Sequence, residues 1–380
     1  EDMGIKDLGP VDGYDLKALR RAFTEAKRVK GPVLVHVLTK KGKGYLPAEE
    51  NPSRFHGTGP FDIQTGEPIS KSGKDSCTDV FSKVMLDLAK KDDRLVAITA
   101  AMEDGTGLAA FHRYYPDRFF DFGIAEANMA CAAAGFAHEG LIPFISTFAL
   151  FGAGRAYEQI RNSIAYVNAN VKFGFSHSGL CVGEDGGSHQ SIEDIALMRV
   201  MPNMTIFVPC DAVEVRKAVR AAAAIEGPVY IRVARPVCEC FTDESTPFVP
   251  GKANIMREGG DVAIIAMGLM VAEALKAANL LAAEGIRATV VNMHTVKPLD
   301  EDAVLSVAEK CGAVVTAEEH SVIGGLGSAV AEVLAGRSGA KFARVGIEDR
   351  FGQSGTPAEL FADYGLTAEN IAENARRLVK

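Results

Sequence analysis

The chain has 380 residues, of which 47% are hydrophobic and 24% charged, and a formal net charge of −8. This length allows two or three domains. The negative balance argues against a nucleic-acid binder, whose affinity rests on cations that meet phosphates. No apolar run reaches the ~18 residues of a membrane span, and no signal-peptide pattern opens the chain, so we expect a cytoplasmic protein.

The cysteines fit neither a disulfide framework nor a zinc site. There are seven in 380 residues, and the nearest pair, Cys238 and Cys240, is separated by one residue. Zinc ligands usually stand two to four residues apart. We therefore expect reduced thiols, as is usual in a cytoplasm.

The first elements are one helix and one strand. The amphipathic pattern LKALRRAFTEAKRV predicts a helix between Asp15 and Val29, and VLVHVL predicts a buried strand over 33–38. Because two elements do not make a domain, we expect residues 1–38 to be the tail of an α/β domain whose remainder precedes Glu1. Residues 39–74 hold four prolines and almost no periodicity, which indicates a linker or a long ordered loop.

Helices and strands then alternate, which is typical of a parallel sheet covered on both faces. This pattern predicts one α/β domain over 75–236, a second linker over 237–260 and a smaller α/β domain over 261–380. The fold class is thus two doubly wound, mostly parallel-sheet domains after a remnant of a third. In the first domain the predicted helices are 77–90, 124–138, 153–167, 190–200 and 211–225, and the strands are 95–99, 143–147, 171–176, 205–209 and 228–234. In the second, the helices are 271–284, 301–310 and 327–336, and the strands are 261–267, 288–293, 313–319 and 342–347.

The segment FFDFGIAEAN (119–128) is the first candidate for a functional site. A strand leads through Gly123 into a helix with Glu126 in its first turn. The helix dipole alone favours a glutamate there. The surrounding alanines and methionine, however, predict a desolvated carboxylate.

A second candidate is the glycine-rich segment SHSGLCVGEDGGSHQ (176–190). His177 ends a strand, and Asp185 and His189 lie on the loop that follows, at the edge where parallel sheets bind ligands. We expect an acid–base cluster, with Ser188 as an alternative helix N-cap. No helical H-x-x-x-H or H-x-H pattern supports a metal site. The glycines at 152 and 154 complete no nucleotide-binding motif and are more simply turns or helix starts.

Several motifs together resemble a known superfamily. GIAEAN, STFALF (146–151), GEDGGSHQ and VARP (233–236) resemble the thiamine-diphosphate-dependent transketolases. GPVDGYD (9–15) and TKKGKGYLPAEENPSRFHGTGPFD (39–62) resemble its 1-deoxy-D-xylulose-5-phosphate synthase branch. In contrast, GEDGGSHQSIEDIALMR, GGLGSAVAEVLA and FGQSG are more similar to the C-terminal subunit of a split transketolase.

The resemblance implies roles for individual residues in binding thiamine diphosphate. Glu126 matches the carboxylate that bonds the pyrimidine N1′ of the cofactor, and Phe148, or alternatively Phe151, matches the ring that stacks on it. Family positions that contact cofactor or substrate and move protons correspond to Asp185, His189 and His56.

The resemblance also implies a substrate-binding group. His177 resembles a histidine near the substrate, and Arg235 aligns with an arginine that binds phosphate. Arg155 resembles a second such arginine but stands several residues further along the chain. Arg232 is expected to face away from the site and to pair at the surface.

One family feature is absent from these residues. The cofactor's diphosphate and Mg²⁺ are held in the family by a domain marked G-D-G, and neither E-D-G here, at 103–105 or 184–186, fits that motif. The resemblance thus implies no metal ligand in this chain, with Mg²⁺ held by a missing N-terminal domain. We expect the isolated chain to be inactive and to work as a homodimer or paired with a pyrophosphate-binding domain.

Three functions follow from the resemblance. The first is 1-deoxy-D-xylulose-5-phosphate synthase, an enzyme of isoprenoid biosynthesis that joins pyruvate to glyceraldehyde 3-phosphate with loss of CO₂. The second is a transketolase that exchanges two-carbon ketol units between sugar phosphates. The third is a non-catalytic β-type subunit that completes a partner's site.

Overall fold

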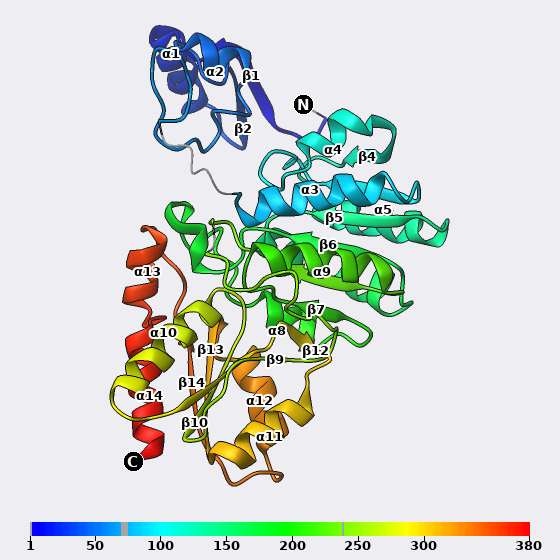
Figure 1. The fold of residues 1–380 in the computed structure, drawn as a ribbon. Coiled ribbons are helices and arrows are strands. Elements are labelled where there is room, and N and C mark those ends of the chain that lie inside the picture. Colours follow the sequence, from blue (N-terminus) through cyan, green and yellow to red (C-terminus); the bar gives the residue numbers. More distant parts are fainter. Residues whose placement is uncertain (1, 70–74, 238) are drawn as a thin grey trace. The chain divides into compact units, whose positions relative to one another are not determined.

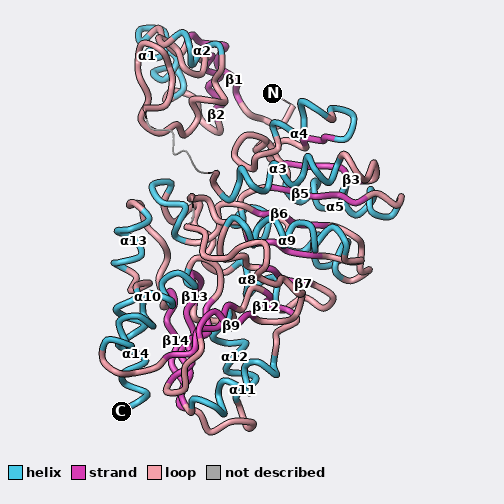
Figure 2. Tube along the Cα trace, viewed as in Figure 1, coloured by secondary structure: helices cyan, strands magenta, loops and turns pink. Residues whose placement is uncertain are grey.

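The computed structural model describes residues 2–69, 75–237 and 239–380. Cys238 and residues 70–74 of the expected linker lie outside the described residues. The chain divides into two compact units, residues 1–73 and 74–380. Both are drawn in Figure 1, and Figure 2 distinguishes their helices from their strands. None of the helices in the described part is long and apolar enough to cross a membrane.

The first unit contains two parallel strands and the helix between them. β1 (Lys6–Asp12) pairs with β2 (Val33–Leu38), and α1 (Leu16–Ala26) connects them. Asp15 caps α1 by accepting hydrogen bonds from two backbone amides that a helix start leaves unpaired. The predicted helix and strand are both present, but the expected burial of the strand is wrong: β2 alternates between half-buried and exposed residues. β1 is not among the predicted elements.

Residues 39–69 have a local structure of their own. They contain the short helix α2 (Leu46–Glu50) and three aromatic rings, Tyr45, Phe55 and Phe61, whose centroids lie 5.2–5.7 Å apart. Such a cluster has no regular spacing along the chain, which explains why periodicity does not reveal it.

The larger sheet of the second unit has seven strands in the order β12-β7-β8-β6-β5-β3-β4. Six are parallel, and β12 joins the edge antiparallel to β7. Most of these strands are buried along their whole length, as their apolar runs predict. The strands are β3 (Leu95–Thr99), β4 (Phe119–Asp121), β5 (Ile142–Ser146), β6 (Lys172–Phe175), β7 (Thr205–Phe207), β8 (Val229–Arg232) and β12 (Thr295–Lys297).

Two groups of helices cover the two faces of this sheet. α3 and α9 pack together over one apolar cluster, and α5, α6 and α8 pack over another. Of these helices, α3, α5, α8 and α9 are labelled in Figure 1. The helices are α3 (Cys77–Ala89), α4 (Ala109–Tyr114), α5 (Glu126–His138), α6 (Ala149–Arg155), α7 (Tyr157–Gln159), α8 (Asp194–Arg199) and α9 (Ala212–Ala224). Short helical turns follow at Pro116–Arg118, Ile160–Ala165 and Leu180–Asp185, the last of which we call η3.

Two helix starts differ from the prediction. α6 begins at Ala149, not 153, and its interior Gly152 lies against the Phe175 ring of β6. α8 begins at Asp194, not 190, because the backbone of Ser191 is bridged to Ser178.

The smaller sheet has five strands in the order β14-β13-β10-β11-β9, of which β9 alone is antiparallel. β9 falls in the stretch expected as the second linker, and α13 and α14 are not predicted. The strands are β9 (Asn254–Arg257), β10 (Val262–Ala266), β11 (Ala288–Asn292), β13 (Ala313–Ser321) and β14 (Lys341–Ile347). The helices are α10 (Met270–Ala283), α11 (Glu301–Cys311), α12 (Leu326–Leu334), α13 (Pro357–Asp363) and α14 (Ala368–Val379).

The two sheets share one interior. A single buried apolar cluster includes Ile98 and Phe173 of the larger sheet, Ile265 of the smaller sheet, and Val330 of α12. The predicted α/β class with mostly parallel sheets is confirmed.

Candidate functional site

Glu126 is the first residue of α5, at the carboxyl end of the larger sheet. Asp121, at the end of β4, accepts hydrogen bonds from the backbone nitrogens of Ala101 and Gly123, and Gly123 turns the chain with φ 67°. The Glu126 side chain is buried, with 4% of the residue exposed. Its Oε1 accepts a hydrogen bond from Arg155 Nη1 at 2.7 Å, and among the described residues no donor meets its Oε2. The desolvated position expected for this carboxylate is confirmed.

A row of stacked side chains lies beside this carboxylate. Phe148 is the N-cap of α6 and is bridged to Ser176, which places its ring 3.8 Å from that of His177 at an angle of 16°. The Phe151 ring lies 5.9 Å from Phe148, and the Arg155 guanidinium stands over Phe151 at 4.1 Å. Because α6 follows β5 directly, one strand end delivers both rings and the arginine.

His177 follows β6 and is buried against Phe148. Its φ of 54° lies in the left-handed region, and its Nδ1 is 3.0 Å from Ser176 Oγ. Burial, together with the charge of Arg235 and the neighbouring His189, lowers the pKa of His177 to about 3. The imidazole is therefore neutral at physiological pH and can exchange hydrogen bonds without bringing a charge into the site.

The glycine-rich loop gives Asp185 and His189 different neighbours. The His189 ring meets the edges of Phe151 and Phe148, with centroids 5.2 and 6.4 Å away. Asp185 ends η3 and is exposed, and its Oδ2 lies 3.2 Å from Arg235 Nη1. Arg235 also donates to the carbonyl of Val182 at 2.5 Å, so the loop fixes the guanidinium.

The second unit therefore brings most of the predicted site residues together in two groups. An ion pair and ring contacts join Glu126, Arg155, Phe151, Phe148, His177 and His189. Asp185 and Arg235 form a separate ion pair, and the charge of Arg235 acts on His177. His56 belongs to the first unit, where it is exposed, so its place in the site stays a prediction.

Two expectations about neighbouring residues are wrong. Arg232 does not pair at the surface: it is 5% exposed and forms a 2.9 Å ion pair with buried Asp194. The alternation rule fails because both faces of this sheet are covered. Ser188 does not cap α8, and its hydroxyl lies 3.0 Å from His189 Nδ1.

Sequence reasoning also misses a buried acid that contacts the loop. Glu319, in β13, accepts a hydrogen bond from the backbone nitrogen of Cys181 in η3 at 2.6 Å. The run Glu318-Glu319-His320 at the end of an apolar strand is the signal that points to it, because charged residues are rarely buried without a partner.

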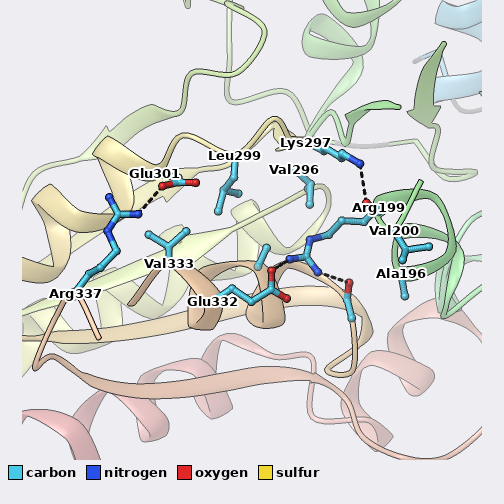
Figure 3. Close-up of a pocket in the computed structure, with 12 residues that line it drawn as sticks. Ala196, Arg199, Val200, Val296, Lys297, Leu299, Glu301, Glu332, Val333 and Arg337 are labelled. Atoms are coloured by element: carbon cyan, nitrogen blue, oxygen red, sulfur yellow. Dashed lines mark hydrogen bonds and ion pairs between the residues drawn. The ribbon is translucent and has the colours of Figure 1, made fainter. Parts of the chain in front are cut away.

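A cavity in the second unit lies apart from these side chains, and no metal site accompanies them among the described residues. Within the described ranges, no group of three or more His, Cys, Asp or Glu side chains could hold a metal ion. A cavity of about 630 Å³ lies between α8, β12, α11 and α12, and no predicted site residue lines it (Figure 3). Its cations are already paired: Arg199 with Glu332, Lys297 with the Arg199 carbonyl and Arg337 with Glu301.

The chain is similar to a solved split-gene transketolase, an inactive β4 tetramer. The two are 47% identical and superpose with a TM-score of 0.75, over 80% of this chain and 98% of the other. The chain belongs to the transketolase family. The model of the transketolase pyrimidine binding domain matches residues 74–239, and that of the transketolase C-terminal domain matches residues 251–371. A third family model, 1-deoxy-D-xylulose-5-phosphate synthase, matches residues 1–39.

Other members of the family are similar over nearly the whole chain. The 1-deoxy-D-xylulose-5-phosphate synthase of Heliobacterium modesticaldum is 46% identical over 100% of this chain, and synthase 1 of Geobacter sulfurreducens is 44% identical over 98%. This chain covers 59% of the length of each. The Leishmania mexicana transketolase shares the fold, with 22% identity and a TM-score of 0.69 over 100% of this chain and 67% of that one.

Proposed function

We propose that this chain is the pyrimidine-binding and C-terminal part of a 1-deoxy-D-xylulose-5-phosphate synthase. The observation that carries the proposal is the buried carboxylate of Glu126 at a strand end, beside two aromatic rings, in a chain 41–46% identical to several synthases. The whole enzyme would join pyruvate to glyceraldehyde 3-phosphate and release CO₂, a step of isoprenoid synthesis. Residues 75–236 and 261–380 would be the two domains, and 1–38 the tail of a pyrophosphate-binding domain.

The side chains fit the pyrimidine end of thiamine diphosphate. Glu126 Oε2, which accepts no hydrogen bond from a described residue, would accept one from the pyrimidine N1′. Phe148, with Phe151 beside it, supplies the aromatic surface for the ring. When bound, the cofactor supplies a nucleophilic thiazolium carbon that stores the electrons of a two-carbon fragment. Burial strengthens the bond at Glu126, which is how this residue would promote the cofactor's ionisation.

The remaining residues would bind substrate and move protons. Arg235 is half-buried and held by Asp185 and Val182, which suits it to a phosphate or a carboxylate of the substrate. Arg155 would have to leave Glu126 to do the same, so we assign it the secondary role. Neutral His177 would hold a substrate oxygen, and His189, Asp185 and His56 would exchange protons with it.

The rest of the enzyme would complete the site. We propose that Mg²⁺ and the diphosphate are held by a domain outside these residues, in the same polypeptide or in a partner chain. We further propose a cytoplasmic homodimer. On this view the isolated chain is inactive, in keeping with the inactive β4 form of the split-gene relative.

Transketolase is the second candidate function, favoured by the 47% identity to the split-gene enzyme. The third is a non-catalytic β-type subunit that completes a partner's site. Neither of these two would release CO₂ from pyruvate, as the synthase would.

The test uses the complete gene product with thiamine diphosphate and Mg²⁺. We expect CO₂ release from pyruvate that depends on glyceraldehyde 3-phosphate, with no ketol transfer from xylulose 5-phosphate to ribose 5-phosphate. Ketol transfer without CO₂ release would replace the synthase with transketolase. Absence of both reactions, with the cofactor shown to bind, would support the non-catalytic subunit.

A further inference from the structure

The loop that carries Asp185 and His189 is closed at its base, where the backbones of Ser178 and Ser191 meet; we call this place the neck of the loop. Ser178 and Ser191 form a parallel bridge, and the Gly179 nitrogen donates to the Ser191 carbonyl at 2.9 Å. Whatever fixes this neck therefore sets the positions of both residues on the loop. The elements that meet it include β8 of the larger sheet and β13 of the smaller sheet.

Glu319 of β13 holds the first side of the neck. Its carboxylate is buried, with 3% of the residue exposed, and its Oε1 accepts the Cys181 nitrogen at 2.6 Å. The backbone of Gly179 presses against the same group: a Cβ there would stand 2.4 Å from Oε1, and the residue has φ +77°. The carboxylate and the bare backbone are thus fitted to each other, and only glycine permits so close an approach.

Arg232 joins the second side of the neck to the same strand. Its Nη2 donates to the carbonyl of Ser191 at 3.2 Å and to the carbonyl of Glu319 at 3.0 Å. Its Nε donates to Asp194 Oδ2 at 2.9 Å, and Tyr230 donates to the same oxygen. The Arg232, Asp194 and Tyr230 side chains are all buried, so water does not compete for these bonds.

We propose that Glu319 is a positioning residue for the candidate site: through this carboxylate, strand β13 of the smaller sheet fixes the Asp185–His189 loop. The proposal rests on the proposed function for the site, because it assigns Glu319 an effect on substrate binding. Glu319 touches neither substrate nor cofactor in this role. It acts through Cys181 and Gly179 on the loop, and through the loop on Arg235, which bonds Val182 and Asp185.

The adjacent residue provides a matched control. Glu318 is buried to 0% exposure on the same strand, and burial raises the pKa of each of the two carboxyls to about 7. Successive residues of a strand face opposite sides. Glu318 accordingly accepts the backbone nitrogens of Leu326 and Gly327, at 2.7 and 2.8 Å, and orders the start of α12.

Amide hydrogen exchange on this chain tests the contact without any need for activity. We expect Glu319→Ala to accelerate exchange of the amides in 179–190 by ~10-fold or more, as for the loss of a bond to a carboxylate. Glu318→Ala should instead accelerate exchange at 325–330. Glu319→Gln keeps an acceptor oxygen and should restore most of the protection. Unchanged exchange in 179–190, or equal acceleration by both alanine variants, would overturn the proposal.

Two further measurements cover other outcomes. If Glu319→Ala does not fold, Gly179→Ala displaces the same carboxylate and should give the same exchange pattern. In the complete enzyme, Glu319→Ala should raise the KM for the phosphorylated substrate about tenfold through misplaced Arg235. Partial unfolding would lower kcat and leave KM unchanged, which would contradict the role in substrate binding. An inactive wild-type enzyme would reject the proposed function, and the exchange result would still decide the contact.

Discussion

The pairing of Glu126 with Arg155 combines a buried acid with a base that is half exposed. The carboxylate side chain is 5% exposed and the guanidinium 49%, so the arginine can move to solvent at low cost and the carboxylate cannot. The arginine also stacks on Phe151, which gives it a second contact at the same place. We infer that a ligand bonded to Oε2 of Glu126 would at most displace the arginine from Oε1, with α5 remaining in place.

Replacement of Glu126 tests its proposed part in the chemistry. In the complete enzyme, Glu126→Ala should lower kcat by ~10²–10⁴-fold, the range for a lost acid–base partner. Steady-state kinetics at saturating cofactor measure this. Glu139→Ala changes an exposed acid at the C-terminal cap of the same helix and should leave kcat within about twofold. Equal activity in both variants would remove Glu126 from the mechanism.

At this scale the sequence reveals single residues better than pairs. Glu126 and His177 can be identified because each stands beside a strand end within a local motif. The Arg155–Glu126 contact joins residues 29 positions apart, and Arg235–Asp185 joins residues 50 apart. Such pairs depend on how strands are ordered in the sheet, which local spacing does not determine.

Helix α6 delivers Phe148, Phe151 and Arg155 to the site, and one glycine sets how closely it approaches the sheet. A Cβ at Gly152 would stand 2.2 Å from the Phe175 ring of β6. Two residues later in the helix, a Cβ at Gly154 would meet nothing within 4 Å. The GAG sequence thus contains one glycine needed for packing and one that is not.

Alanine at each glycine separates these two roles. Gly152→Ala should destabilise the chain by ~1–3 kcal/mol through overpacking, and should lower kcat because the rings shift. Gly154→Ala should stabilise it by up to ~1 kcal/mol, since alanine favours a helix interior. Urea unfolding gives both values. Similar effects of the two substitutions would contradict the close approach of α6 to β6.

The apolar pattern of the sequence predicts most of the regular strands. It fails where contacts with distant parts of the chain determine where an element begins or pairs. The predicted strands correspond to β3, β5 to β8, β10, β11, β13 and β14 because buried parallel strands form continuous apolar runs. α8 begins late because the bridged neck of the loop occupies the residues before it. β9 and β12 are short edge strands of three or four residues, too brief for a periodic signal.

For the whole molecule, buried groups of opposite sign set the dependence of stability on pH. Burial lowers the pKa of three histidines and raises that of three glutamates: His177 to about 3, His294 and His320 to about 4, and Glu214, Glu318 and Glu319 to about 7. The histidines contribute less to the stability of the fold as pH falls below 6.5, the pKa of histidine in the unfolded chain, because the unfolded chain then binds more protons. The glutamates favour it less as pH rises from 4.5, their unfolded value, towards 7.

The histidine and glutamate contributions to stability change in opposite directions between pH 4.5 and 6.5. These limits are the pKa values of glutamate and histidine in the unfolded chain. We expect the free energy of unfolding to be nearly flat across that window. It should decline towards pH 3 and between about 6.5 and 7, with ~1.4 kcal/mol per pH unit for each group whose protonation differs. Urea unfolding at a series of pH values measures the curve. Glu214→Gln should lower stability throughout but make the decline near pH 7 shallower; an unchanged slope would contradict the role of that carboxyl.

The short strand β12 links the parts of the second unit that hold the smaller and the larger sheet. Its residues come after β11 of the smaller sheet, yet they pair with β7 at the margin of the larger one. A protease that nicks the stretch between residues 237 and 260 would therefore not release two free globules. Separated from β12, the amino-terminal piece would expose β7 as an unpaired edge strand. Such an edge can pair with a strand of another molecule and lead to aggregation. Gene fragments meant for expression should keep residues 75–297 on one polypeptide.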